Sequence, residues 1–448
     1  MADDFPQEWL DKIDKAVEEV HDDLIEWRHH IHQNPELSNR EEKTAKYIAD
    51  LLEDFGYDDV VTGLGGHGVA TVLHGGGSPE GKRRSIVLRA DIDALPVPDK
   101  SGVEFASEVV DKDYPGGPFP VTHACGHDAH AAMLLAAAKV LADLKEDVPG
   151  DVVFAFQPAE EGPPVDEPGG AREMVKEAFF DELDPEPTMA FGMHVGGGPK
   201  GWVMYSQGVQ NGSSELLSIK ITGEQVHGSS PWQGKDPMPP AAEIITAMGQ
   251  IYRQLDAQKD FTITIGHIQD EGRFNVVGNS VTLLGTVRCL QEGVEAQINE
   301  RIERTAKHIA AAYDCEAEVE FIQQVPPVVN RPEWVEKILP SFHRSTRGDA
   351  KVIEVPASLG YDDVSEFINR WGGIYGLLGV QDVEVDEDGN LKETEGGRGF
   401  VANHSPKFYV DDEAMVTGVR MHVNVALDHL RGTLVPDAVS YTHLRAHE

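Results

Sequence analysis

The sequence predicts an α/β protein in which a largely parallel sheet forms the main domain and a ferredoxin-like domain is inserted. Short apolar segments alternate with amphipathic segments early in the chain, which is typical of parallel strands connected by helices. From about residue 208 the expected order becomes β-α-β-β-α-β, the order of a ferredoxin-like domain. The first pattern then resumes. We therefore expect a discontinuous main domain at 1–207 and 322–438, and an inserted domain at 208–321.

The main domain is expected to begin with helices. Apolar residues at steps of three and four predict a helix from about Gln7 to His32, and a second amphipathic helix from Asn39 to Phe55. A segment rich in Ala and Leu, without Gly or Pro, predicts a further helix from about Ala129 to Val148. Apolar runs predict the buried strands of the sheet at 69–73, 85–90, 151–158 and 188–195.

The inserted domain is expected to contain two helices, at 239–258 and 296–313. Its strands are expected at 215–223, 261–269, 280–289 and 316–324. A helix from Pro332, a strand at 372–379 and a helix at 412–430 then return to the main domain. The last ten residues, 439–448, are unlike the rest of the chain, and we expect them to be a non-native tail.

Composition and charge restrict the kinds of partner. The chain has 448 residues, of which 40% are hydrophobic and 26% charged, as is typical of a globular protein. Its formal net charge of −39 disfavours binding to nucleic acid or to anionic membranes. The acidic residues are distributed along the chain, and pairs such as Glu41 and Glu42 are interpreted as solvated. This distribution suggests a salt-adapted (halophilic) source as a hypothesis.

Cellular location follows from what the sequence lacks. The apolar runs are too short to span a membrane, and the acidic N-terminus does not have the layout of a signal peptide. Three cysteines do not make a disulfide framework. We therefore expect a cytoplasmic protein.

Polar residues with metal-binding side chains follow the expected strands where these strands end. Those that follow three of the strands are Asp91, Asp93, Glu160, Glu161 and His194. Cys125 and His127 lie in a loop that enters a helix, where free N–H groups favour thiolates. Ligands collect at the carboxyl ends of parallel strands. Together with His404 these residues offer nitrogen, oxygen and sulfur donors for one transition metal or a pair.

A series of eight motifs extends over nearly the whole chain. In order they are RHHIHQNPELS, RADIDALP, HACGHDAH, FQPAEEG, FGMHV, VHGSSPWQGKDP, FNVVGNSVTLLGTVR and NHSP. This series resembles the motifs of the aminoacylase/carboxypeptidase-type metallopeptidase family. The branch that it resembles most contains hippurate hydrolase, indole-acetyl-amino acid hydrolases and N-acyl-amino acid amidohydrolases. The resemblance implies a zinc-exopeptidase-like main domain and an inserted domain that serves as a lid and in dimerisation.

The resemblance also implies a site with two divalent ions per subunit. Manganese or zinc is expected, with cobalt or nickel as further options. Five residues are assigned to the metals, with Cys125 as the bridging thiolate: Cys125, His127, Glu161, His194 and His404. Glu160 corresponds to the general base, which takes a proton from the attacking water and gives it to the leaving amine. Asp93 and Asp91 would orient a ligand histidine.

The inserted domain carries three further residues that match the family motifs. His227 corresponds to a residue that stabilises the oxyanion in the site of the partner subunit of a homodimer. Asn275 and Arg288 correspond to residues that bind the substrate carboxylate, for which a guanidinium group is well suited.

The function implied is that of a metal-dependent amidohydrolase acting on small N-acyl amino acids, hippurate-like or auxin-conjugate-like. An exopeptidase or dipeptidase with the same metals is an alternative, because the bond that it cleaves is also an amide. A catalytically silent metal-binding protein is a second alternative, against which the intact Glu160 argues. Five other histidines are interpreted as packing, surface or hydrogen-bonding residues: His29, His30, His32, His123 and His130.

Overall fold

The computed structural model describes residues 5–79 and 81–434, so the tail expected at 439–448 lies outside the described residues. The chain forms two compact units. The first comprises the residues up to Gly208, Asn330–Val355 and the residues from Glu366 onward. The second comprises Val209–Val329 and Pro356–Ser365. The sequence analysis placed 322–329 and 356–365 in the main domain, whereas the structure places both segments in the second unit.

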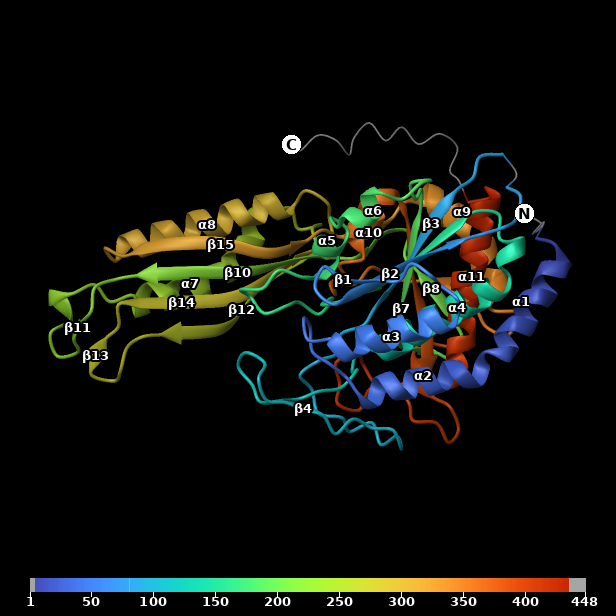
Figure 1. The fold of residues 1–448 in the computed structure, drawn as a ribbon. Coiled ribbons are helices and arrows are strands. Elements are labelled where there is room, and N and C mark those ends of the chain that lie inside the picture. The colour runs from blue at the N-terminus through green and yellow to red at the C-terminus, as the bar shows by residue number, and fades with distance from the viewer. Residues whose placement is uncertain (1–4, 80, 435–448) are drawn as a thin grey trace. The chain divides into compact units, whose positions relative to one another are not determined.

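The first unit is built around an eight-stranded sheet (Figure 1), with the order β1-β2-β6-β3-β7-β18-β8-β17. Its strands are β1 (Val61–Leu64), β2 (Gly68–His74), β3 (Ser85–Asp91), β6 (Asp151–Gln157), β7 (Ala190–Pro199), β8 (Val203–Tyr205), β17 (Val352–Glu354) and β18 (Gly373–Gln381). The four central strands, β6, β3, β7 and β18, are parallel to one another. Antiparallel pairs occur toward the edges, between β1 and β2, β2 and β6, and β8 and β18. The predicted α/β class with a mainly parallel sheet is confirmed.

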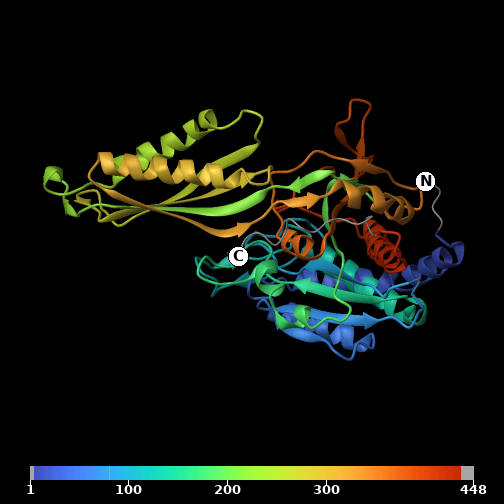
Figure 2. The same cartoon turned by 90° about the horizontal axis from the view of Figure 1, so that it is seen from above.

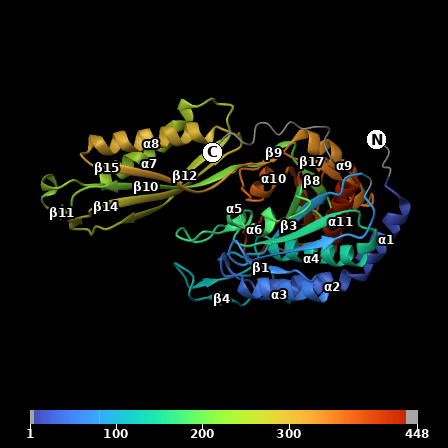
Figure 3. The same ribbon diagram turned by 45° about the horizontal axis from the view of Figure 1, so that its top comes forward.

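Helices cover both faces of this sheet, and Figure 3 shows α2 and α3 along one side. One face packs against α1 (Gln7–Glu19), α2 (His21–Gln33), α3 (Glu42–Asp54), α4 (His127–Asp143), α9 (Pro332–Ser345) and α11 (Met415–Arg431). The other packs against α5 (Gly170–Met174), α6 (Ala178–Asp181) and α10 (Ser365–Trp371). Because successive side chains of a strand point to opposite faces, Val152 and Phe154 of β6 join the first core, and Val153 and Ala155 the second.

Some elements differ from those expected. The single helix expected at 7–32 is two helices, α1 and α2, which meet at Val20. Strands β1, β8 and β17 were not expected, because runs of three or four residues are too short to show a strand pattern. The unit also contains two short hairpins, β4 (Val110–Asp111) with β5 (Phe119–Pro120) and β19 (Val383–Val385) with β20 (Leu391–Glu393).

The second unit contains a four-stranded antiparallel sheet and two helices (Figure 2). In chain order its main elements are β10 (Ser213–Thr222), α7 (Met238–Ile251), β12 (Phe261–Asp270), β14 (Ser280–Cys289), α8 (Glu295–Ala312) and β15 (Glu316–Val325). The sheet order is β12-β14-β10-β15. Leu217, Ile219 and Ile221, alternate residues of β10, pack in one core with residues of both helices. The helices therefore cover one face of the sheet.

Two small strand pairs complete the arrangement. β9 (Gly208–Asn211) pairs with β16 (Val328–Asn330), and β11 (Val226–His227) pairs with β13 (Val276–Val277). Across residues 5–79 and 81–434, the helices are too short or too polar for any to span a membrane.

Candidate active site

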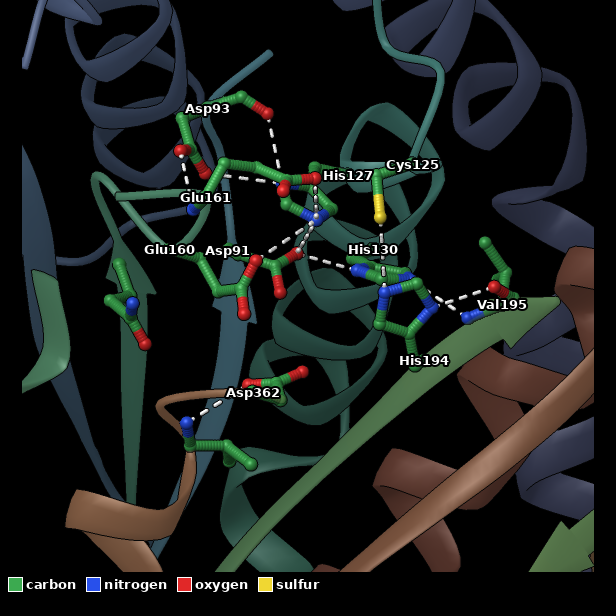
Figure 4. Close-up of polar contacts among 12 residues, drawn as sticks. Asp91, Asp93, Cys125, His127, His130, Glu160, Glu161, His194, Val195 and Asp362 are labelled. Carbon is green, nitrogen blue, oxygen red and sulfur yellow. Dashed lines mark hydrogen bonds and ion pairs between the residues drawn. The ribbon is translucent and has the colours of Figure 1, made fainter. Parts of the chain in front are cut away.

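The candidate site lies where central strands of the first unit meet the start of α4 (Figure 4). Asp91 is the last residue of β3, and Glu160 and Glu161 follow shortly after the end of β6. His194 lies within β7, and His127 is the first residue of α4. Four separate segments of the chain, which are distant in sequence, thus bring polar side chains together, although His194 lies inside β7 and not after the end of a strand as expected.

The five residues expected to bind metal lie together. The Sγ atom of Cys125 lies 3.3 Å from Nε2 of His194. Nε2 of His404 lies 3.2 Å from Oε1 of Glu161. One group of donor atoms, all within 4.8 Å of one another, joins Cys125 to His127 and His194. A second such group joins the same thiol to Glu161 and His404. A sulfur shared in this way can contact two ions at once.

The two adjacent glutamates take different positions. Glu161 shares one donor group with Cys125 and His404, and another with His127 and Glu160. Oε2 of Glu160 lies 3.8 Å from Nε2 of His127. Glu161 is the glutamate that shares a donor group with the Cys125 thiol.

Asp93 orients His127. Nδ1 of His127 lies 2.9 Å from the main-chain oxygen of Asp93 and 3.1 Å from its Oδ1, so this nitrogen carries the proton and donates. In the neutral imidazole Nε2 then carries no proton, and this atom points toward Cys125 and the glutamates. It is buried and makes no hydrogen bond with any described residue. A buried acceptor of this kind calls for a ligand, and a metal ion is the partner that suits it.

Asp91 acts on a different histidine from the one expected. Its Oδ1 accepts a short hydrogen bond from Nδ1 of His130, and Nε2 of His130 accepts the N–H of Val195 at 2.8 Å. Nη1 of Arg89 donates to Oδ2 of Asp91 at 2.8 Å. His130, interpreted from the sequence as a hydrogen-bonding residue, thus connects Asp91 to the backbone next to His194.

The electrostatics of the cluster favour a bound cation. Burial lowers the pKa of His127, but the carboxylates of Asp91 and Asp93 raise it more strongly, to about 10. Burial raises the pKa of the Cys125 thiol well above its usual range, and Glu161 adds to this effect. Nearby carboxylates contribute to both shifts, and divalent ions would offset their negative charge. The donors present therefore fit a pair of transition-metal ions.

A buried network holds the start of α4. The Nδ1 and Nε2 atoms of His32 lie 2.8 Å and 3.0 Å from carboxylate oxygens of Asp128 and Asp99. Nε of Arg28 donates to the same oxygen of Asp128 at 3.0 Å. Burial lowers the pKa of His32, but Asp128 and Asp99 together raise it above its usual value, which favours an imidazole that donates on both sides. The network fixes the helix end that carries His127.

Glu41 is a residue near the site that the sequence analysis interpreted wrongly. It was taken as part of a solvated acidic pair, but its side chain is fully buried. Its Oε1 accepts the N–H of Ala159 at 2.8 Å. Burial, with Asp93 next in effect, raises the pKa of Glu41 to about 8. Its neighbour Glu42, which begins α3, is exposed, so an adjacent pair of acids does not share one environment.

Comparison with known proteins agrees with this geometry. Residues 87–428 match the sequence model of Peptidase family M20/M25/M40. The chain belongs to this family. The family expected from the motifs is thereby confirmed.

Named relatives and solved structures match most of the chain. Thermostable carboxypeptidase 2 of Saccharolobus solfataricus is 32% identical over 424 residues, which cover 93% of this chain and 98% of that one. Hippurate hydrolase of Campylobacter jejuni is 35% identical over 310 residues, which cover 69% of this chain and 75% of that one. The crystal structure of Bacillus subtilis YXEP, a dinuclear metal-binding peptidase of the M20 family, matches with a TM-score of 0.70 and 25% identity. This match covers 92% of this chain and 99% of that chain.

Two other residues matched to M20-family motifs, His227 and Asn275, are neighbours in the second unit. His227 lies on β11, and its exposed side chain accepts the N–H of Ser229 through Nδ1 at 3.1 Å. The main-chain oxygen of Asn275 accepts the N–H of Gly228 at 2.9 Å. Both residues therefore belong to the paired segments β11 and β13.

Arg288 lies in another part of the same unit. It is near the end of β14, where its guanidinium group lies 4.5 Å from the centroid of the Tyr361 ring. Asn275 precedes the start of this strand, which has ten residues. Ten residues of strand span ~30 Å, so within one chain His227 and Arg288 do not converge on one point.

Proposed function

We propose that the protein uses two divalent ions to hydrolyse the amide bond of N-acyl amino acids, releasing a carboxylic acid and an amino acid. The observation that carries this proposal is the Cys125 thiol shared by two donor groups, beside the adjacent carboxylates of Glu160 and Glu161. The relative named hippurate hydrolase supports the substrate class, because hippurate is an N-acyl amino acid. The similarity to YXEP, a dinuclear metal-binding peptidase, supports a pair of ions.

Five residues of this chain would hold the ions. Cys125 would serve as a ligand to both through its thiolate, and the other ligands would be His127, Glu161, His194 and His404. Manganese or zinc suits this mixed donor set, and cobalt or nickel are further options. Two ions bound there would polarise the scissile carbonyl and lower the pKa of the attacking water. Asp93 keeps His127 in the tautomer whose Nε2 is free to bind metal.

Glu160 is the general base in this proposal. Its carboxylate accepts a proton from the attacking water as the new C–O bond forms. When the C–N bond breaks, the same carboxyl gives this proton to the leaving amine nitrogen, and the residue returns to its starting state. Glu160 is buried, so bulk water does not compete for the proton.

The second unit would complete the site in a homodimer. His227 of one subunit stabilises the oxyanion in the site of the other, and Asn275 would enter that site with it. Arg288 of the second subunit would bind the substrate carboxylate together with this Asn275. His227 and Arg288 lie toward opposite ends of β14, too far apart to reach one substrate from the same chain. This separation supports a site that takes the two residues from two different chains.

An exopeptidase activity is a second candidate. The relative named thermostable carboxypeptidase 2, which matches nearly the whole chain, favours it. Both activities cleave an amide next to an amino acid with a free carboxylate, so the same residues would serve both.

The test is a comparison of rates on metal-loaded protein. We expect kcat/KM for hippurate-type substrates to exceed that for free dipeptides. Extensive chelation should abolish activity, and manganese, cobalt or zinc should restore it. A Glu160→Gln variant, purified in the same way, excludes a contaminating hydrolase. Higher kcat/KM on dipeptides would favour the exopeptidase, and full activity after removal of metal would contradict the proposal.

A further inference from the structure

The short connection between β6 and Glu160 has an unusual backbone conformation. Ala159 has φ = 52°, in the left-handed region that residues with a Cβ seldom adopt. This residue is buried and directly precedes Glu160. A backbone held in such a conformation needs contacts that stabilise it, and such positions are concentrated at functional sites.

Buried carboxyl groups hold the main chain on both sides of Glu160. The N–H of Ala159 donates to Oε1 of Glu41 at 2.8 Å, and the N–H of Glu161 donates to Oδ2 of Asp93 at 3.0 Å. Figure 4 shows the second of these contacts. Ser38 donates to the same oxygen of Asp93 at 2.6 Å. Two segments far from Glu160 in sequence thus fix the backbone around it.

Glu41 is not needed to cap its own helix. It precedes α3, and the N-terminus of that helix is capped by Glu36, whose Oε2 accepts the N–H groups of Lys43 and Thr44 at 2.9 Å each. Burying a carboxyl group costs free energy, so a buried one that caps nothing calls for another role. Asp93 also orients His127, whereas the contact of Glu41 with Ala159 serves the connection before Glu160.

From these contacts we propose that Glu41 is a positioning residue, which holds Ala159 in its left-handed conformation and thereby aims Glu160 at the substrate. The inference gives a role to the end of the segment RHHIHQNPELSNRE, whose motif the sequence analysis found without explaining it. It rests on the proposed function, in which Glu160 is the general base.

The test compares two substitutions of Glu41. Glu41→Ala removes the acceptor, so we expect kcat to fall ~10–100-fold, because small displacements of a catalytic group have effects of this size. KM should stay within about twofold, and both ions should remain bound, because the metal ligands are untouched. Glu41→Gln keeps an oxygen for the Ala159 N–H and should restore kcat to within about threefold of the original protein.

Glu36→Ala is the matched control, because it removes an acceptor carboxylate from the same segment without touching Ala159. It should lower Tm and leave kcat unchanged. A second measurement compares the residual rate of the double variant Glu41→Ala/Glu160→Gln with that of Glu160→Gln alone. If Glu41 acts through Glu160, the added substitution should change the residual rate less than about twofold.

Three outcomes would overturn the inference. They are an unchanged kcat in Glu41→Ala, a loss that is equally large in the Glu160→Gln background, and a loss of metal in proportion to activity. If Glu41→Ala does not fold, Glu41→Gln decides, and a fall of ~10-fold or more with both ions bound contradicts the hydrogen-bond role. Full activity of Glu160→Gln itself would refute the proposed function. Failure of the proposed function is therefore distinguishable from failure of the proposed role of Glu41.

Discussion

Glu160 and Glu161 are adjacent in sequence but meet different partners. Oε1 of Glu161 lies 3.2 Å from His404 and shares a donor group with Cys125. Glu160 approaches His127 at 3.8 Å and shares a donor group with His127 and Glu161. Two like charges side by side cannot perform the same task well, so one is suited to hold metal and its neighbour to move a proton.

The same isosteric change at each position separates these tasks. Glu160→Gln should retain two ions per chain, while kcat falls ~10²–10⁴-fold because the proton acceptor is lost. Glu161→Gln should lower metal occupancy, since an amide is a poorer ligand than a carboxylate. Elemental analysis and kcat on the same samples measure both effects, and each variant is the control for the other. The opposite pattern would exchange the two assignments.

The residues proposed to contact substrate or metal stand out in the sequence more clearly than those that hold them. Cys125 and His127 stand in a dense cluster of donors, and Glu160 follows an obvious apolar strand. Glu41 and His130 act through contacts with segments more than 60 residues away, Glu41 with Ala159 and His130 with Val195. Such long-range contacts leave no local pattern in a single sequence, so they become visible only in the folded protein.

At the scale of secondary structure, α11 illustrates how a helix can be predicted while its chemistry is not. Its periodicity was evident from the sequence, but its burial on nearly all sides depends on packing against α9 and the sheet. Two histidines of this helix, His422 and His429, are buried as neutral groups. Burial lowers the pKa of each to about 3, with His130 adding to the effect at His422 and Arg84 at His429.

These histidines should make the fold sensitive to mild acid. The pKa of each histidine is lower in the folded chain than its value of about 6.5 in the unfolded chain. Above pH 6.5 these histidines are neutral in both states, so they take nothing from the free energy of unfolding. It is lost as the pH falls toward 3, because the unfolded chain then binds protons that the folded chain does not. From pH 7 to pH 5 the loss is ~2 kcal/mol for each histidine.

His429→Gln tests this sign. We expect the variant to lose ~2 kcal/mol less than the original protein between pH 7 and pH 5. The glutamine amide can keep a hydrogen bond to Thr188, which lies 2.9 Å from Nε2 of His429. Denaturant unfolding at both pH values measures the difference, and the exposed His308→Gln is the control. An identical loss in His429→Gln and the original protein would show that His429 is not buried as a neutral group.

For the molecule as a whole, the sequence predicted the order of the elements better than their boundaries. The alternation of strands and helices indicated the α/β class, because each parallel strand needs a covering connection. Short strands such as β8 and β17 exist only through pairing with distant partners, and a single sequence carries no signal for them. Residues 356–365 join the second unit through contacts of the same kind, such as the bridge between Asn211 and Ser358.

A functional dimer is the largest-scale consequence of the proposed function. His227 and Asn275 lie before β14, and Arg288 lies near the end of that strand, ~30 Å away. An oxyanion donor must come within ~3 Å of the developing charge. The group that binds the carboxylate of the same substrate is separated from this donor only by the length of that small substrate. One chain cannot provide both His227 and Arg288 to the same substrate with this spacing, whereas two chains related by a twofold axis can.

Mixing two inactive variants tests this arrangement. Alone, His227→Ala loses the oxyanion donor and Glu160→Gln loses the base, so each should be nearly inactive. In a heterodimer, the site on the His227→Ala chain keeps its own Glu160 and receives the intact His227 of its partner. The other site lacks both groups. Random exchange at equal concentrations gives one heterodimer in two, so activity should return to about a quarter of that of the original protein. Subunit exchange is verified with two distinguishable tags, and a mixture of His227→Ala with itself is the control. If exchange is complete and no activity returns, His227 acts within its own chain or takes no part in the reaction.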